Sequence, residues 1–502
     1  MHQSDTEQLL AAFAVFFPGA DGVGSYVSGQ LVAGTGAPVT LYNAATGQPV
    51  LSYPDAGTAV VEQAIAAATT AQRQWWSLTH AARGRVMFQI GQQIRAHAEP
   101  LAMLEALNAG KPIRDCRGEA LKVAEMFEYY AGWTDKFYGE VIPVPTSHLN
   151  YTRREPIGTV LQITPWNAPM FTGGWQIAPA IAMGNAVLLK PSELTPLTSL
   201  ALALLIEKAG APVGLVNVLA GFGHTTAQAA IQQRAIKKVV FVGSPATGGK
   251  IAEAAAKRTL PCVLELGGKS ANIVFEDADL KRACLGAQAA IFSGAGQSCV
   301  AGSRLLVQRS VYDEFVAMLS RGADRIQVGS PLDDKTEVGP ISNKTQYEHV
   351  RRLIDAGVAG GATVTTRMAD DAPGYFVRPT VLANASNAMD VARTEIFGPV
   401  VVAIPFDTEE EAIAIANDSE FGLAGAVWTE NVARAHRVAA LVQAGTFWIN
   451  GYKTINVASP FGGYHSSGYG RSSGVEALYE YTQTKSVWVE TAREPATSFG
   501  YL

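Results

Sequence analysis

Hydrophobic residues gather along the chain in two kinds of segment, which predict two kinds of element. Long alanine-rich segments predict helices at residues 58–75, 80–108, 116–136, 196–210 and 407–418. Short runs rich in β-branched residues predict buried strands at residues 158–164, 185–190, 216–220, 237–243 and 271–275. Because the strands alternate with helices, the pattern predicts βαβ units and a parallel sheet.

A second series of strands follows, at residues 303–308, 400–406, 425–429 and 445–450. Two such series in one chain predict an α/β fold with two domains, which divide near residue 266. A chain of 502 residues is long enough for both domains to bury large cores without disulfides.

Charge and cysteine usage exclude several classes of function. The net charge is −5, and no run of Lys and Arg is longer than a pair, which argues against a nucleic-acid partner and a polybasic membrane anchor. The apolar stretch 9–17 follows Asp5 and Glu7, whereas a signal peptide begins with positive charge. Four cysteines without CxxC spacing favour free thiols in a reducing compartment and predict no metal site. We therefore expect a soluble, cytoplasmic protein.

One cysteine, Cys299, ends a run of small and polar residues in the segment GAGQSC (294–299). Small neighbours leave room for a substrate to reach the sulfur atom, and a thiolate is a strong nucleophile. From these residues alone, Cys299 is either such a nucleophile or a buried, inert thiol.

One glycine-rich turn is a candidate for phosphate binding, and another fails the test of a fingerprint. The segment GFGHTT (221–226) begins as a GxGxxG fingerprint but lacks the third glycine. The segment KKVVFVGSPATGGKI (237–251) places a strand, a tight turn and a helix in order. There Gly243, Ser244 and Gly248 would let a phosphate approach the helix N-terminus, although an ordinary strand-to-helix turn explains the pattern equally well.

Polar residues at or near the ends of predicted strands suggest a ligand crevice. Asn167 follows one strand, and Lys190 ends the next, with Glu193 three residues later. Such side chains can contact a ligand at the carboxyl edge of a parallel sheet, although a turn asparagine and a solvated ion pair are alternatives. Glu265 lies among apolar residues, where a carboxylate is costly unless it serves as a general base or pairs with Lys269.

Together these segments resemble the NAD(P)-dependent aldehyde dehydrogenase superfamily, from about residue 26 to the C-terminus. The matching segments occur in the family's order and spacing, and they are TPWNAP, KPSELTP, FVGSPATG, ELGGKS, FSGAGQSC, EIFGPV, FGLAGAVWT and SPFGGYHSSGYGR. The resemblance implies the aldehyde dehydrogenase fold: a Rossmann-like cofactor domain, an α/β catalytic domain and a small β arm for oligomerisation.

The resemblance also implies a mechanism in which Cys299 is the nucleophile of an aldehyde oxidation with NAD. Its thiolate would attack the aldehyde carbonyl, and the Asn167 amide together with the backbone N–H of Cys299 would hold the developing oxyanion. A hydride would pass to the nicotinamide and leave a thioester. Glu265 would activate the water that hydrolyses this thioester to the carboxylic acid.

Further residues receive roles from the same resemblance. Those implied to bind the cofactor are Ile163, Trp166, Lys190, Glu193, Gly223, Gly243, Ser244, Gly248, Gln346, Glu395 and Phe397. A carboxylate near the ribose 2′ oxygen accepts a hydroxyl but repels a phosphate, so Glu193 favours NAD over NADP. Those implied to line the substrate pocket are Thr172, Trp175, Phe292, Ser298, Ile455 and Phe461.

The aromatic members of that pocket suit an apolar aldehyde body. Lys122 and Lys453 would lie near the mouth of the substrate tunnel, where they would favour a remote carboxylate or would simply be solvated.

The implied domains divide the chain into three parts. Residues 1–136 and 153–265 would bind the dinucleotide, residues 266–481 would carry the catalytic domain, and residues 137–152 with 482–502 would form the arm. Family members commonly pair through such an arm, so a homodimer or homotetramer is expected.

Two positions depart from the common family pattern. Gln176 and Ser472 stand where many relatives carry Lys and Glu of a proposed proton relay behind the general base. This leaves open how Glu265 releases its proton. The alternatives to aldehyde oxidation are a CoA-acylating semialdehyde dehydrogenase, a non-catalytic binding protein on the same fold, and a cysteine hydrolase without redox chemistry.

Overall fold

Two parallel sheets form the framework of the molecule, and the computed structural model describes residues 2–367, 373–494 and 500. The core of the first sheet contains five parallel strands in the order β9 (Val216–Val218), β8 (Ala186–Lys190), β7 (Thr159–Ile163), β10 (Ile236–Val242) and β11 (Cys262–Glu265). The antiparallel strands β1 (Ser25–Val27) and β2 (Gln30–Val32) extend one edge, and β21 (Gly468–Tyr469) closes the other.

The carboxyl ends of the parallel strands lie level along one edge of the first sheet. Ile163 is paired with Lys190 on one side and with Phe241 on the other, and Val242 is paired with Glu265. Residues that directly follow these strands therefore gather at the same edge, where ligands bind in open α/β sheets.

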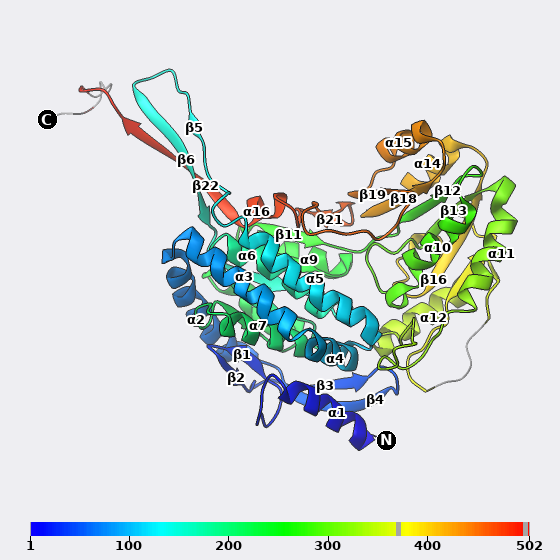
Figure 1. Ribbon diagram of the computed structural model, residues 1–502, viewed down its shortest axis with the longest axis horizontal. Helices are drawn as coiled ribbons and strands as arrows, with labels where there is room; N and C mark the ends of the chain where they lie inside the picture. Colours follow the sequence, from blue (N-terminus) through cyan, green and yellow to red (C-terminus); the bar gives the residue numbers. More distant parts are fainter. Residues whose placement is uncertain (1, 368–372, 495–499, 501–502) are drawn as a thin grey trace.

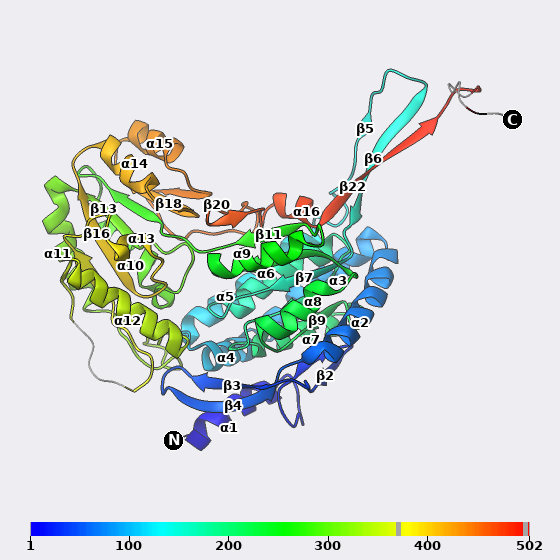
Figure 2. The ribbon, with the colours of Figure 1, turned by 180° about the vertical axis from the view of Figure 1, so that it is seen from behind.

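Helices pack against the first sheet, with α3 and α5 toward the viewer in Figure 1 and α8 and α9 toward the viewer in Figure 2. Their bounds are α2 (Gly57–Ser77), α3 (His80–Ala96), α4 (Ala98–Ala109), α5 (Ile113–Ala131), α6 (Pro169–Ala182), α7 (Leu197–Lys208), α8 (Gln228–Gln232) and α9 (Pro245–Ala256), with a π-helical turn at Gly223–Ala227.

The prediction of one helix over residues 80–108 is wrong in one respect. The structure divides this segment into α3 and α4 at His97, whose φ of −111° and ψ of 20° leave the helical range. Pro100 explains the division, because it has no N–H to donate to the residue four positions earlier and its ring crowds that carbonyl.

The N-terminal segment belongs to the first core. Helix α1 (His2–Ala14) buries Leu9 and Phe13, and Phe16 and Phe17 continue the same apolar face. The antiparallel pair β3 (Pro38–Asn43) and β4 (Gln48–Pro54) lies beside α1 (Figure 1). The apolar stretch 9–17 is thus part of a packed core, and none of the helices within the described residues is long and apolar enough to cross a membrane.

The second sheet is also largely parallel. Its strands follow the order β14 (Thr363–Val364), β15 (Thr380–Ala383), β16 (Val400–Phe406), β13 (Arg304–Gln308), β12 (Ala271–Val274), β18 (Ala424–Trp428) and β19 (Thr446–Ile449), of which β14 is antiparallel. The helices of this part are α10 (Leu280–Ile291), α11 (Tyr312–Ala323), α12 (Lys344–Ala359), α13 (Asp390–Arg393), α14 (Glu409–Asn417) and α15 (Val432–Leu441).

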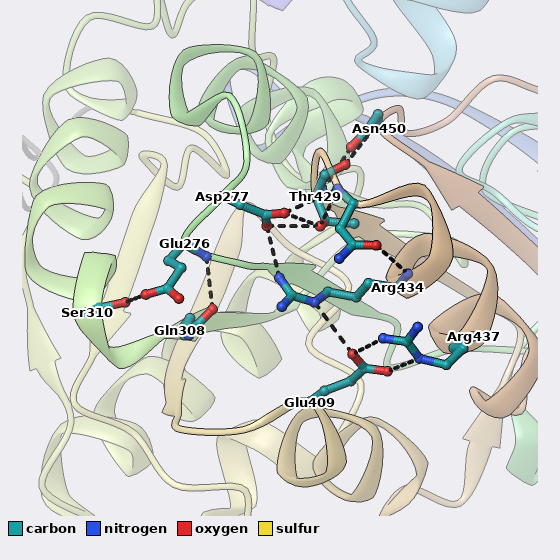
Figure 3. Close-up of polar contacts among 10 residues, drawn as sticks. Glu276, Asp277, Gln308, Ser310, Glu409, Thr429, Arg434, Arg437 and Asn450 are labelled. Atoms are coloured by element: carbon teal, nitrogen blue, oxygen red, sulfur yellow. Dashed lines mark hydrogen bonds and ion pairs between the residues drawn. The ribbon is translucent and has the colours of Figure 1, made fainter.

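A polar network ties the ends of the second sheet to its outer helices (Figure 3). Asp277, which follows β12, accepts hydrogen bonds from the Thr429 hydroxyl after β18 and from Arg434 on α15. Arg434 also lies 3.4 Å from the Glu409 carboxylate on α14 and over the Phe275 ring. One guanidinium therefore connects two helices to the sheet.

A three-stranded arm projects from the body in both views (Figures 1 and 2). It consists of β22 (Thr482–Glu490), β6 (His148–Pro156) and β5 (Val141–Ile142), all antiparallel. The pairing of β22 with β6 is continuous from Thr482 opposite Pro156 to Glu490 opposite His148.

Just before the arm, the chain returns to the first sheet. Strand β17 (Phe421–Gly422) pairs with β20 (Tyr464–His465), and the next strand, β21, pairs with β11 of the first sheet. Helix α16 (Glu476–Glu480) and Tyr481 then pack on the first core. Residues 468–481 thus contact the first core, although the sequence division assigned them to the catalytic part.

Candidate active site

Cys299 lies in the connection between α10 and β13, directly behind a turn of unusual backbone geometry. Gly294, Ala295 and Gly296 have φ values of 65°, 56° and 68°, in the left-handed region. A side chain at Gly296 would meet the backbone of Gly398, because an added Cβ would lie 2.0 Å from its carbonyl oxygen. The small residues before Cys299 are therefore required by the path of the chain as well as by access to the sulfur.

The thiol of Cys299 faces a cavity of about 1320 Å³. Of the four cysteines, it is the one that lines this cavity, whereas Cys116 and Cys284 are buried in cores. Burial raises the pKa of the Cys299 thiol to about 12, and the nearby carboxylates of Glu395 and Glu265 contribute in the same direction.

Asn167 approaches the same loop from the first sheet. It lies between β7 and α6, and its side-chain Nδ2 donates a hydrogen bond of 2.8 Å to the Gln297 carbonyl. This bond fixes the amide beside the cysteine loop and uses only one of its two N–H groups. Asn167, Gln297 and Cys299 all line the cavity.

Glu265 ends β11 and lines the cavity from the side of the first sheet. Its Oε1 accepts a hydrogen bond of 2.6 Å from the Ser472 hydroxyl, while its buried Oε2 has no hydrogen-bond partner among the described residues. Burial raises the pKa of this carboxyl to about 8, against the opposing effects of Ser472 and Arg471. A carboxyl with such a pKa can serve as a general base near neutral pH. The alternative partner, Lys269, makes no ion pair with it.

At the carboxyl edge of the first sheet, the predicted cofactor residues are divided between the cavity and its surroundings. The ammonium of Lys190 lies 3.3 Å from the Glu193 carboxylate, so the two side chains form an ion pair. Ser244 caps α9 by accepting a hydrogen bond from the Thr247 backbone N–H. Those that line the cavity are Trp166, Gly243, Ser244, Gln346, Glu395 and Phe397, and those outside its lining are Ile163, Lys190, Glu193, Gly223 and Gly248.

The residues of this edge fit a dinucleotide. An added Cβ at Gly243 would lie 2.5 Å from the Phe241 ring, and one at Gly248 would lie 2.6 Å from the Leu266 side chain. In the first turn of α9, only the small residues Pro245 and Ala246 line the cavity. A helix N-terminus attracts phosphate oxygens through its free N–H groups.

A second group of predicted cofactor residues converges from the other sheet. Gln346 on α12 donates hydrogen bonds to the Ile396 and Phe397 carbonyls, at 2.9 and 3.1 Å. Glu395 accepts a hydrogen bond of 3.0 Å from the Gly268 backbone N–H. The Phe397 ring meets the edge of Trp166, with ring centroids 5.3 Å apart, and so joins the two halves of the cavity.

Most of the predicted substrate-pocket residues line the cavity, and the aromatic ones form one wall of it. Trp175 stacks on Phe171 at 5.1 Å and meets Phe461 edge to face at 6.0 Å. The predicted residues that line the cavity are Thr172, Trp175, Ser298, Ile455 and Phe461. Phe292 does not line it, because its ring is buried in the second core at the end of α10.

Sequence reasoning missed Phe171 in this wall. Phe171 and Trp175 lie four positions apart on α6, so the helical spacing predicts that both side chains lie on one face. Such spacing on the helix that follows Asn167 was the signal available in the sequence.

Both predicted mouth lysines, Lys122 and Lys453, line the cavity. Lys453 donates to the Ser293 hydroxyl at 2.8 Å, and burial lowers the pKa of its ammonium to about 8. The positive charge of the neighbouring Lys111 is balanced by ion pairs with Glu105 and Glu119.

Comparison with known proteins identifies the family. A model described as the aldehyde dehydrogenase family matches residues 31–487. The chain belongs to the aldehyde dehydrogenase family. It is 42% identical over 456 residues to retinal dehydrogenase 2 of Homo sapiens, across 90% of this chain and 88% of that protein. It is also 42% identical over 457 residues to a betaine aldehyde dehydrogenase of Cereibacter sphaeroides (strain ATCC 17023), across 91% of this chain and 94% of that protein.

Among solved structures, the aldehyde dehydrogenase fold is reproduced closely by PnpE from Pseudomonas sp. WBC-3, in its complex with nicotinamide adenine dinucleotide. The TM-score is 0.93 at 42% sequence identity, over 95% of this chain and 99% of that chain. The two parallel sheets and the projecting arm are thus the framework of an aldehyde dehydrogenase.

Proposed function

We propose that the protein oxidises aldehydes to carboxylic acids with NAD through a covalent adduct on Cys299. The observation that carries this proposal is that Cys299, Asn167 and Glu265 line one cavity, which extends to the carboxyl edge of the first sheet. Family membership supports the same reaction. A thiol, an amide donor and a carboxyl base are the groups that acyl transfer through a thioester requires.

Each of the three residues has a distinct role in this reaction. The Cys299 thiol gives its proton to water, and the resulting thiolate attacks the aldehyde carbonyl carbon. The second N–H of Asn167 and the backbone N–H of Cys299 stabilise the oxygen that becomes negative. Bound NAD supplies the hydride acceptor for the oxidation. Glu265 then takes a proton from the water that attacks the thioester carbon, so that the acid leaves and the thiolate returns.

The first sheet and α9 would hold the cofactor. Trp166, Ser244 and the ion pair Lys190–Glu193 would hold the adenosine half, and Gln346 with Glu395 would hold the nicotinamide half. The Glu193 carboxylate supports NAD over NADP, because it repels a 2′-phosphate. NAD-bound structures of PnpE and of the Bacillus cereus aldehyde dehydrogenase support the same choice.

The remaining features of the proposal concern substrate, assembly and location. The aromatic wall suits an apolar aldehyde body, and Lys122 and Lys453 favour a remote carboxylate at the other end. We also propose residues 1–136 with 153–265 as the cofactor domain and residues 266–481 as the catalytic domain, with β21 and α16 packed on the former. The arm supports a homodimer or homotetramer, and the four free thiols support a reducing cytoplasm.

The substitution Cys299→Ala tests the proposal, with Cys262→Ala as the matched control because that thiol lies outside the cavity. We expect Cys299→Ala to form no NADH from a panel of aldehydes while it binds NAD with unchanged affinity by calorimetry. The control keeps its activity. Turnover by Cys299→Ala at even a tenth of the wild-type rate contradicts the assignment.

The same panel separates the alternatives. A CoA-acylating enzyme releases an acyl-CoA only when CoA is added, whereas the presence of Glu265 supports release of the free acid. A non-catalytic protein forms no NADH, and a cysteine hydrolase does not bind NAD.

A further inference from the structure

The carboxylate of Glu265 is held from behind by a residue that lies 207 positions later in the chain. The Ser472 hydroxyl donates to Glu265 Oε1 at 2.6 Å, and its own backbone N–H donates to the Phe461 carbonyl at 2.9 Å. Ser472 is 2% exposed and Glu265 is 4% exposed. The hydroxyl is therefore anchored by the backbone and shielded from bulk water.

A chain of hydrogen bonds continues behind Ser472. The Gln176 side-chain Nε2 donates to the Ser472 hydroxyl at 3.1 Å, and the Tyr481 hydroxyl donates to Gln176 Oε1 at 2.9 Å. Gln162 in turn donates to the Tyr481 oxygen at 3.1 Å. Gln162, Tyr481, Gln176 and Ser472 are all buried. Each of them donates its hydrogen bond to the next group in the direction of Glu265.

This polarity decides where a proton on Glu265 can go. The amide nitrogen of Gln176 is not basic, and the Ser472 hydroxyl already donates to Oε1. The series of hydrogen bonds behind Glu265 therefore accepts no proton at neutral pH. The second oxygen, Oε2, is buried without a hydrogen-bond partner among the described residues, and Glu265 lines the cavity. Oε2 is therefore the oxygen left without a donor, and a small rotation of the side chain would bring it to the cavity.

Other charged groups near Glu265 come from the neighbouring elements. Arg471 favours the carboxylate form, whereas Glu480 opposes it and is itself paired with Lys238 at 2.5 Å. The Cys299 thiol faces the same cavity. None of these groups is within hydrogen-bond distance of the carboxylate. Among the described residues, the hydrogen bond from Ser472 therefore sets the orientation of the Glu265 carboxylate.

We propose that Ser472 is a positioning residue for thioester hydrolysis, which holds Glu265 Oε1 so that Oε2 takes the proton of the attacking water. In this step the water oxygen bonds to the thioester carbon, its proton moves to Oε2, and the carbon–sulfur bond breaks to return the thiolate of Cys299. The proton then passes from Oε2 to water in the cavity. This inference rests on the proposed role of Cys299 and Glu265 in aldehyde oxidation.

The test uses 4-nitrophenyl acetate on the full-length protein without NAD. This ester acylates a reactive thiol and releases nitrophenolate in a burst, after which the steady state reports hydrolysis of the thioester alone. The variants are Ser472→Ala, which removes the donor, and Ser472→Thr, which keeps a hydroxyl. The matched control is Ser473→Ala, because Ser473 is equally buried but donates to the Ser459 carbonyl.

For Ser472→Ala we expect an unchanged burst and a steady state whose pH midpoint moves up by about 1 to 2 pH units, because the carboxylate loses its donor. Ser472→Thr restores the midpoint, and Ser473→Ala leaves it unchanged. A Ser472→Ala midpoint equal to that of the wild type overturns the proposal, as does a Ser472→Thr midpoint equal to that of Ser472→Ala.

Failure of the underlying function gives a different result. A wild-type protein that shows no nitrophenolate burst, or that forms no NADH from any aldehyde, contradicts the role of Cys299 rather than that of Ser472.

Discussion

The thiol of Cys299 and the carboxyl of Glu265 face the same cavity, and burial raises the pKa of both. Each group is needed as its anion, but in a different step, because attack requires a thiolate and hydrolysis requires a carboxylate. Their mutual repulsion disfavours ionisation of both at once. A neutral Glu265 therefore makes the Cys299 thiolate easier to form, and its later ionisation serves hydrolysis.

The pH dependence of turnover follows from the Glu265 carboxyl. Its pKa is raised to about 8, and its base form is the active one, so the steady-state rate rises as pH increases through about 8. At pH 6, two units below this value, the rate is about a hundredfold below the plateau. Stopped-flow NADH traces with saturating aldehyde measure this rate after the burst.

The substitution Glu265→Gln removes this base. We expect a normal burst followed by a steady state that is ~10²–10⁴-fold slower and no longer depends on pH near 8. Equal slowing of the burst and the steady state would show that Glu265 does not act mainly in hydrolysis.

We expect Lys453 to influence substrate preference, because it lines the cavity and is charged below a pKa of about 8. We expect KM for an ω-carboxylate aldehyde to lie a few-fold below that of its neutral analogue at pH 7, in keeping with ~0.2–1 kcal/mol for an ion pair that is partly open to solvent. High salt and a pH above 9 both reduce the difference.

Steady-state kinetics of the two aldehydes measure this preference. Lys453→Ala removes most of the difference, and Lys122→Ala provides a parallel measurement at the second lysine. Equal KM values in the wild type would leave the aromatic wall as the only source of selectivity.

At the residue scale, the sequence motifs located most of the site. Asn167 follows β7 and Glu265 ends β11, so parallel topology predicts that they lie at one edge of the first sheet. Cys299 precedes β13 of the second sheet, so only tertiary packing brings it to the other two. Phe292 could not be excluded from the pocket in this way. It directly follows α10, and only the packing of that helix decides which way its ring points.

At the scale of elements, the buried strands were the most predictable, because β-branched runs of five to seven residues such as β7, β8, β10 and β16 have few alternatives. Some short elements escaped detection, although β9 and β12 were predicted. Strand β15 spans only Thr380–Ala383 and β21 only Gly468–Tyr469, so each is defined by its pairing rather than by its own residues. Secondary structure this short depends on tertiary contacts.

The second sheet offers a stability test at Arg434, whose guanidinium joins α14, α15 and the end of β12 (Figure 3). Arg434→Ala leaves the partly buried Asp277 carboxylate with fewer donors and removes the contact with the Phe275 ring. We expect the free energy of unfolding to fall by about 1–3 kcal/mol, measured by urea denaturation.

Arg437→Ala is the matched control. Its side chain is 53% exposed and pairs with Glu409 alone, so the expected loss is below about 1 kcal/mol. A larger loss for Arg437→Ala than for Arg434→Ala would contradict the view that Arg434 is the central connection.

At the scale of the whole molecule, the arm presents apolar side chains to solvent. Val141 is 72% exposed, Trp488 is 55% exposed, and the outer edge of β22 pairs with no strand among the described residues. An open edge of this kind is usually covered by another chain. We therefore expect the arm to carry the contact between subunits.

The substitution Val141→Asp tests this contact. It places a charge in the expected interface and should weaken self-association by at least about tenfold, measured by sedimentation velocity over a micromolar concentration series. Val432→Asp is the control, because Val432 is 71% exposed but lies on α15, away from the arm. A wild-type monomer, or a Val141→Asp variant that sediments as the wild type does, would exclude the arm as the interface.

The return of the chain to the first core has a consequence for biosynthesis. The second core runs without interruption from Ala271 to Val442, so it can fold while the ribosome is still translating. The first core reaches Leu266 early but is completed only by Tyr481. At about 5–20 residues per second, roughly 200 residues take about 10–40 s to translate. During that interval a nascent chain already contains Cys299, but Ser472 has not been added. The donor to Glu265 is therefore translated well after the nucleophile, and the hydrogen bond that orients Glu265 forms only once Ser472 has joined the first core.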